Sequence, residues 1–182
     1  MIIGITGTLG AGKGTVVEYL VKTRGFRHFS VRDFLNKEID AQGLEHNRDV
    51  MLQVANELRA SHGPGYIAEQ LMLQAKEYGK DSVIESVRSL GEAEYLKKEG
   101  ALLWAVDADI QTRYERIVKR MSETDKVSLE KFKADEAREF ANTDPSKPNI
   151  QAVMRMSDST LLNVSTPEEL HEQVESALQK GA

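Results

Sequence analysis

Two glycines five residues apart and a lysine directly after the second could bind phosphate near the start of the chain, at Gly7, Gly12 and Lys13. Glycines let backbone amides approach an anion closely, and a lysine adds a point charge for the β- and γ-phosphates of a nucleotide. We expect a nucleotide loop in which Lys13 is also catalytic, rather than a glycine-rich turn without a ligand. The residues expected to bind ATP are Gly7, Thr8, Leu9, Gly10, Ala11, Gly12, Lys13, Gly14 and Thr15.

The residue after the lysine departs from the commonest form of this loop. Gly14 stands where a serine or threonine usually binds magnesium, and Thr15 follows one position later. The run from Gly10 to Thr15 resembles adenylate kinase and its nucleoside monophosphate kinase relatives. The resemblance implies ATP and Mg²⁺ as cofactors, with the metal held largely through water by Thr15 and by acids further along the chain.

Two acids are candidates for that metal site. Glu85 ends a short apolar run, and Asp33 follows another run in Ser30-Val31-Arg32-Asp33. In the resembling family, acids at these places order magnesium-bound water, so we expect Glu85 and Asp33 to do so. Asp33 is also a candidate on the acceptor side. An acid in the first turn of a helix is the alternative interpretation of Asp33.

Three charged residues are candidates for binding the acceptor. Arg88, three residues after Glu85, matches the arginine with which the family clamps the acceptor's phosphate, because guanidinium offers paired donors. Glu92 stands where the family often has a glutamine that reads the acceptor's base, but with Ser89 it also forms a possible capping box. Arg59 could bind the same phosphate or complement the end of a helix.

A basic helix precedes the most polar part of the chain. Arg113, Arg116 and Arg120 recur at spacings of three and four, which places them near one helix face. Arg116 and Arg120 best match the family's lid arginines, which stabilise charge on the transferring phosphoryl group, so both are candidate catalytic residues. A solvated basic face is the alternative. Residues 121–150 would then form the lid, with Arg138 as a weaker third arginine.

The arrangement of elements predicts an α/β fold. Apolar runs at residues 1–6, 26–30, 82–85, 101–106 and 159–163 read as strands, and helical patterns separate them. Strands that alternate with helices favour a five-stranded parallel sheet with helices on both faces, and its site lies beyond the carboxyl ends of the strands. We expect one domain, residues 1–182, with an acceptor-binding helical insertion at about 32–78.

Composition narrows the class of partner. The absence of cysteine excludes a disulfide framework and a thiolate zinc site, and a net charge of -5 gives no reason to expect a nucleic acid polymer. There is no signal-peptide pattern and no apolar run long enough to cross a bilayer. We expect a cytoplasmic protein whose partners are ATP and a small phosphorylated acceptor. The oligomeric state stays open.

Nearly the whole chain also resembles an archaeal group of P-loop proteins related to dephospho-CoA kinase and adenylate kinase. The matching stretches are residues 1–15, 55–65, 84–94 and 113–124. The leading hypothesis is an ATP- and Mg-dependent kinase of a nucleoside or deoxynucleoside monophosphate. Dephospho-CoA kinase, with Asp33 as general base, is the second hypothesis. A nucleotide-binding ATPase or switch protein is the alternative from another class.

Overall fold

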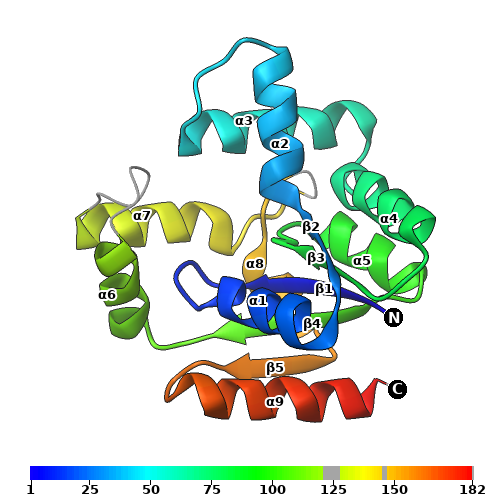
Figure 1. The fold of residues 1–182 in the computed structure, drawn as a ribbon. Helices are drawn as coiled ribbons and strands as arrows, with labels where there is room; N and C mark the ends of the chain where they lie inside the picture. Colours follow the sequence, from blue (N-terminus) through cyan, green and yellow to red (C-terminus); the bar gives the residue numbers. More distant parts are fainter. Residues whose placement is uncertain (121–127, 145–146, 182) are drawn as a thin grey trace.

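A five-stranded, fully parallel sheet forms the centre of the protein (Figure 1). The computed structural model describes residues 1–120, 128–144 and 147–181. The strand order is β2-β3-β1-β4-β5, which confirms the expected sheet. The strands are β1 (Ile2–Gly7), β2 (Arg27–Ser30), β3 (Ser82–Glu85), β4 (Leu102–Asp107) and β5 (Ser159–Leu162).

Helices connect the strands and cover both faces of the sheet, as the sequence predicts. The expected helical insertion at residues 32–78 consists of α2, α3 and α4. A short helix, α8, was not predicted, because six residues are too few to show a helical period. The helices are α1 (Lys13–Arg24), α2 (Val31–Ala41), α3 (Arg48–His62), α4 (Tyr66–Tyr78), α5 (Leu90–Lys98), α6 (Ile110–Arg120), α7 (Leu129–Phe140), α8 (Ile150–Arg155) and α9 (Pro167–Lys180).

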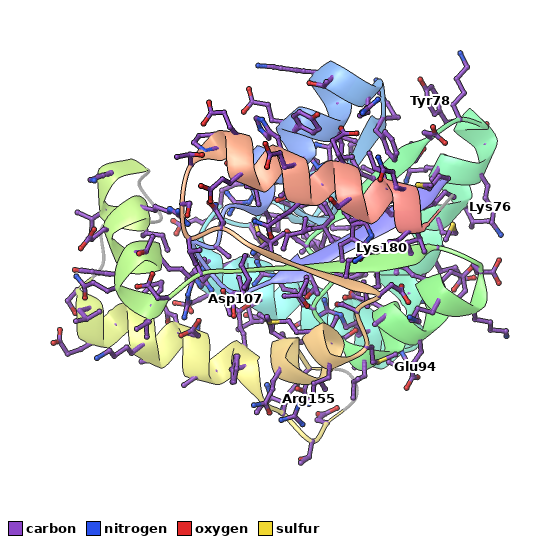
Figure 2. All side chains as sticks on the ribbon, turned by 90° about the horizontal axis from the view of Figure 1, so that it is seen from below. Lys76, Tyr78, Glu94, Asp107, Arg155 and Lys180 are labelled. Atoms are coloured by element: carbon purple, nitrogen blue, oxygen red, sulfur yellow. The ribbon has the colours of Figure 1, made fainter. Side chains whose placement is uncertain are left out.

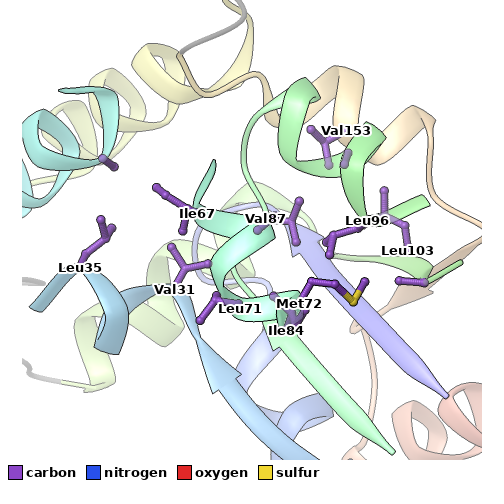
Figure 3. Packing of buried hydrophobic residues seen from close by; sticks show 14 of the residues in the cluster. Val31, Leu35, Ile67, Leu71, Met72, Ile84, Val87, Leu96, Leu103 and Val153 are labelled. Atoms are coloured by element: carbon purple, nitrogen blue, oxygen red, sulfur yellow. The ribbon is translucent and has the colours of Figure 1, made fainter. Parts of the chain in front are cut away.

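The alternation of side chains along the strands creates two cores. Ile5, Val83 and Trp104 point to the face covered by α1 and α9, and all three are buried. Ile84 and Leu103 point to the opposite face, where they pack with residues of α4, α5 and α8 (Figure 3). The sheet is therefore buried on both faces, as expected for parallel strands.

Helix α2 extends away from the sheet, and α3 crosses α2 and contacts it (top of Figure 1). Each begins at a side-chain cap: Ser30 accepts from the backbone of Asp33, and Asn47 accepts from the backbone of Val50. Their facing residues belong to the same core as α4. The α2–α3 pair is thus fixed at its base, and it lines the cavity described below.

The described part of the chain contains no helix long and apolar enough to span a membrane.

The turn after β3 has an unusual backbone conformation at Ser86, whose φ is 75°. The N–H groups of Ser86 and Val87 both donate to the carbonyl oxygen of Ile5, at 3.0 Å each, which fixes the direction of the chain toward Arg88. Among the described residues other than glycine, Ser86 alone has a positive φ. Left-handed backbone at a residue with a side chain costs free energy that a glycine avoids.

We expect Ser86→Gly to raise the free energy of unfolding by about 0.5–1 kcal/mol, since relief of strain exceeds the added entropy of the unfolded chain. Ser86→Val should lower it, because a β-branched side chain tolerates this conformation worse. Urea denaturation of both variants measures the difference. Equal unfolding midpoints for the two variants would show that the turn is not strained.

Candidate active site

The loop between β1 and α1 has the backbone that the glycine pattern predicts. Gly10 and Gly12 have φ of 80° and 97°. A Cβ atom on Gly12 would lie 2.1 Å from Nδ2 of Asn163, and one on Gly10 would lie 2.6 Å from the carbonyl oxygen of Arg113. Both positions therefore require glycine for their conformation and for the close approach of neighbouring segments.

Three residues outside the loop hold it in place. Asn163 Nδ2 donates to the carbonyl oxygen of Ala11 at 2.9 Å. Arg113 Nη1 donates to the carbonyl oxygen of Leu9 at 3.1 Å. The hydroxyl of Thr8 donates to Asp107 Oδ1 at 2.6 Å, and Figure 2 shows Asp107 where β4 turns toward α6.

These three contacts with the loop are only partly predictable from the sequence. Asp107 ends a predicted strand and Arg113 lies on the basic helix face, but their contacts with the loop are not visible in any local pattern. Asn163 follows β5, and it is 152 residues from Ala11 along the chain. Strand β4 pairs with β1 on one side and with β5 on the other. Asp107 at the end of β4 and Asn163 just after β5 therefore lie at the sheet edge from which the loop starts.

Lys13, the first residue of α1, lies folded back over the loop. Its Nζ donates to the carbonyl oxygens of Gly7 and Thr8, at 3.0 and 2.9 Å. Burial, together with the charge of Arg88, lowers the pKa of Lys13 from 10.5 to about 8, although Glu85 and Glu139 act in the opposite direction. The ammonium group of Lys13, which we expect to bind nucleotide phosphates, thus donates to two carbonyl oxygens of its own loop.

This pKa predicts how nucleotide affinity depends on pH. Above pH 8 the free protein loses the Lys13 charge, and a bound phosphate must restore it, so we expect the Kd for ATP to rise about tenfold per pH unit above pH 9. Calorimetry at pH 8 in buffers of different ionisation enthalpy should detect proton uptake. Lys13→Arg, which stays charged, should remove the uptake. Binding without proton uptake at pH 8 would contradict this prediction.

The same shift affects stability with a definite sign. Between pH 8 and 10.5 the folded chain binds fewer protons at Lys13 than the unfolded chain does. The contribution of Lys13 to the free energy of unfolding therefore increases as pH rises through that window.

Glu85, at the end of β3, is a half-buried carboxylate beside the loop. Burial raises its pKa, but His28 and Lys13 lower it further, so the net pKa lies below the usual value and the group is ionised. His28 Nε2 lies 3.0 Å from Glu85 Oε2.

A magnesium ion that arrives with ATP would find suitable chemistry at Glu85. Within residues 1–120, 128–144 and 147–181, no three histidine, aspartate or glutamate side chains cluster as a protein-only metal site. Magnesium usually keeps several waters and needs one or two carboxylates plus phosphate oxygens, which Glu85 fits. Thr15 lies in the first turn of α1, and Asp33 is an exposed first-turn acid of α2; their roles as metal ligands stay predictions.

The predicted acceptor residues Arg59 and Glu92 bind each other. Their side chains are each only 1% exposed, and Nε and Nη2 of Arg59 lie 2.9 and 2.8 Å from Glu92 Oε1. Oε2 of Glu92 accepts from the backbone N–H groups of Arg88 and Ser89, at 2.9 and 3.1 Å. The capping box with Ser89 is confirmed.

Both oxygens of Glu92 are thus used by protein donors, so the geometry gives no support to Glu92 as the reader of an acceptor's exocyclic amine. Arg59 is likewise occupied by Glu92 rather than facing a phosphate. Together they fix the backbone of Arg88. Arg59 also lines the cavity described next, so its role in binding the acceptor stays a prediction.

A cavity of about 210 Å³ lies between the α2–α3 pair, the loop after β3 and α7. Its lining includes apolar side chains, among them Val31, Leu35 and Met51. It also includes charged side chains. These are Arg32, Arg48, Arg59, Arg88 and Glu139.

Three of these charged side chains form ion pairs that were not predicted from the sequence. Glu139, which is buried, accepts from Arg88 through Oε2 and from Arg48 through Oε1. The two arginines come from the loop after β3 and the first residue of α3. Arg48 and Glu139 are 91 residues apart, and no local spacing connects them.

The lid arginines are placed only in part. Arg116 Nη2 donates to the carbonyl oxygen and to Oδ1 of Asn163, at 3.0 and 3.2 Å. Its Nη1 is buried and makes no hydrogen bond to any described residue. The guanidinium of Arg116 lies near the phosphate loop, because Asn163, to which it donates, itself donates to Ala11 of the loop. The side chain of Arg120 is not among the described parts of the structure, nor are residues 121–127. The catalytic role of Arg120 therefore stays a prediction.

The expected lid at residues 121–150 includes α7, which stands with α6 beyond the carboxyl ends of the strands (left of Figure 1). Phe132 anchors α7, fully buried and 5.8 Å from the guanidinium of Arg113. Arg138, the weaker arginine candidate, pairs instead with Asp49 at 3.0 Å and is exposed.

Solved structures share this fold. TT1252 from Thermus thermophilus superposes with a TM-score of 0.61 and 20% identity, covering 99% of this chain and 97% of that one. Shikimate kinase from Aquifex aeolicus gives a TM-score of 0.55 at 16% identity, with coverage of 99% and 97%. Dephospho-CoA kinase from Campylobacter jejuni gives 0.54 at 15%, with coverage of 100% and 97%. The fold is that of the P-loop kinases.

Sequence comparisons give the family. A family model described as an AAA domain matches residues 3–140. A UPF0200 protein of Methanococcus vannielii is 31% identical over 183 residues, covering 98% of this chain and 95% of the relative. One from Thermococcus sibiricus is 30% identical over 172 residues, with coverage of 91% and 87%. The chain therefore belongs to this AAA-domain family of kinase-like P-loop proteins, together with the archaeal UPF0200 proteins.

Proposed function

We propose that this protein is a phosphotransferase that uses ATP and magnesium to phosphorylate a nucleoside or deoxynucleoside monophosphate. One observation carries the proposal: Leu9 of the phosphate loop and Arg88 line the same cavity, and the charge of Arg88 helps to lower the pKa of Lys13. A donor phosphate at Lys13 and an acceptor phosphate at Arg88 would therefore be neighbours.

The chemistry requires no protein nucleophile. An oxygen of the acceptor's phosphate attacks the γ-phosphorus of ATP, the bond from that phosphorus to the β,γ-bridging oxygen breaks, and ADP leaves with the electron pair. Lys13 and Arg116 stabilise the negative charge, and Arg88 orients the acceptor. Magnesium, held beside Glu85, would neutralise further charge on the phosphates.

Dephospho-CoA kinase is the runner-up, and the similarity of fold to such an enzyme supports it. That reaction phosphorylates a hydroxyl and so needs a general base, for which Asp33 is the candidate. Asp33 is exposed, and among the described residues it does not belong to the cavity lining, whereas Arg88 does. The geometry therefore favours an acceptor whose phosphate is the nucleophile.

A panel assay tests the proposal. The protein is incubated with Mg-ATP and, separately, with nucleoside monophosphates, deoxynucleoside monophosphates and dephospho-CoA, and ADP formation is followed. We expect at least one monophosphate to accelerate ADP release, with the matching diphosphate as product. ADP release that no acceptor accelerates would overturn the kinase proposals and favour the ATPase or switch class.

A further inference from the structure

We propose that Glu139 is an internal competitor of the acceptor: its carboxylate occupies the site between Arg88 and Arg48 until the acceptor's phosphate displaces it. The inference rests on the proposed function for the identity of the acceptor. The anion site itself rests on contacts within the chain.

The first argument is the shape of the contact. Glu139 presents one carboxylate oxygen to Arg48 and the other to Arg88. A phosphate monoester has three terminal oxygens and can accept from the same two guanidinium groups. The pair of arginines thus fits a phosphate as well as it fits the carboxylate that bridges them.

The second argument is the position of Glu139 on its own helix. It is the residue before the last of α7, where the negative end of the helix dipole disfavours a carboxylate. Burial also disfavours its charge, while Arg88 and Arg48 offset both effects and hold its pKa below the usual value. The charge of Glu139 is therefore stabilised at this place by the two arginines.

The third argument is location. Arg48, Arg88 and Glu139 all border the cavity, as does Leu9 of the phosphate loop. The side chains of Arg48 and Arg88 are 24% and 29% exposed, so an incoming anion can reach them, whereas the Glu139 side chain is 3% exposed. An anion that replaced Glu139 would therefore border the same cavity as the phosphate loop.

A purely structural latch is the competing interpretation. It predicts that removal of the Glu139 charge lowers stability without strengthening anion binding. A competitor predicts the opposite for binding, because an external anion no longer has to displace the bridging carboxylate. The next carboxylate, Asp135, lies 4.0 Å from Nε of Arg48 and bridges neither arginine to the other.

The test is calorimetric titration of the full chain with inorganic phosphate, after ADP has filled the phosphate loop. We expect Glu139→Gln to bind phosphate at least about tenfold more tightly than the unmodified protein. Adding Arg48→Met to Glu139→Gln should abolish this gain, which assigns it to the two-arginine site and not to the loop. A nucleoside monophosphate titrated in the same way should show the same order.

Glu130→Gln is the matched control, because it removes an exposed carboxylate from the first turn of the same helix. It should leave phosphate affinity unchanged. If Glu139→Gln is unstable, Glu139→Asp keeps the charge but is too short to bridge both arginines, and it should also bind phosphate more tightly. Phosphate affinity equal to that of the unmodified protein in both Glu139 variants overturns the proposal. Because no turnover is measured, this failure is distinct from a failure of the acceptor panel.

Discussion

Replacing Lys13 with alanine is expected to lower acceptor-dependent phosphoryl transfer by at least about 10²–10³-fold, because one preorganised charge at the transferring group is lost. The measurement is kcat for ADP formation with the best acceptor of the panel. The fold should persist, since the hydrogen bonds of the ammonium group to described residues go to two loop carbonyls, and burial disfavours its charge in the folded protein. Circular dichroism and the melting temperature report on this.

Lys22→Ala is the control for the Lys13 variant. Lys22 lies on the same helix, is exposed and pairs with Glu18 four residues away. Its loss should change neither turnover nor stability by a measurable amount, as is usual for exposed pairs. Near-normal turnover in Lys13→Ala would remove the loop from the mechanism and leave the fold as the only link to kinases.

The second large effect concerns the buried pair of Arg59 and Glu92. We expect Arg59→Ala to lower the free energy of unfolding by about 3–5 kcal/mol, because it leaves the Glu92 carboxylate buried without its charged partner. Arg59→Met combined with Glu92→Gln should recover much of this loss, since neither charge is then buried alone. Urea denaturation at neutral pH measures both.

Arg155→Ala, an exposed arginine on α8, serves as the control for Arg59→Ala and should stay within about 0.5 kcal/mol of the unmodified protein. A loss as small as that in Arg59→Ala would contradict the expectation that the buried Glu92 carboxylate needs its charged partner.

The double variant should also show weaker acceptor binding than the unmodified protein, because Glu92 fixes the backbone of Arg88.

Features encoded by neighbouring residues were predictable from the sequence. The phosphate loop lies within seven consecutive residues, and the capping box within four, so their spacing predicts them directly. The sheet was predictable because buried parallel strands are short apolar runs separated by helical patterns. Glu92 satisfies the local capping rule, although it differs from the glutamine that the resembling family often has there, and the structure confirms the capping box.

Features that depend on tertiary contact were not predictable. Arg48 begins α3 and Glu139 nearly ends α7, and each reads in sequence as an ordinary charge on a polar helix face. Only the packing of α3, α7 and the turn after β3 brings them together with Arg88. Likewise, the sequence cannot show that Asn163 reaches back to Ala11, because that contact depends on the register of β4 and β5.

The spacing of Glu136 and Glu139 on α7 has a consequence for the order of binding. Glu136 pairs with Arg113, which holds the phosphate loop, and Glu139, less than one helical turn later, pairs with Arg48 and Arg88, for which we propose acceptor binding. A ligand that moves this turn of α7 by displacing the ion pairs of Glu139 would therefore also change the ion pair of Glu136 with Arg113, and the reverse also holds. Donor and acceptor affinities are then thermodynamically linked, and each ligand must change the affinity for the other by the same factor.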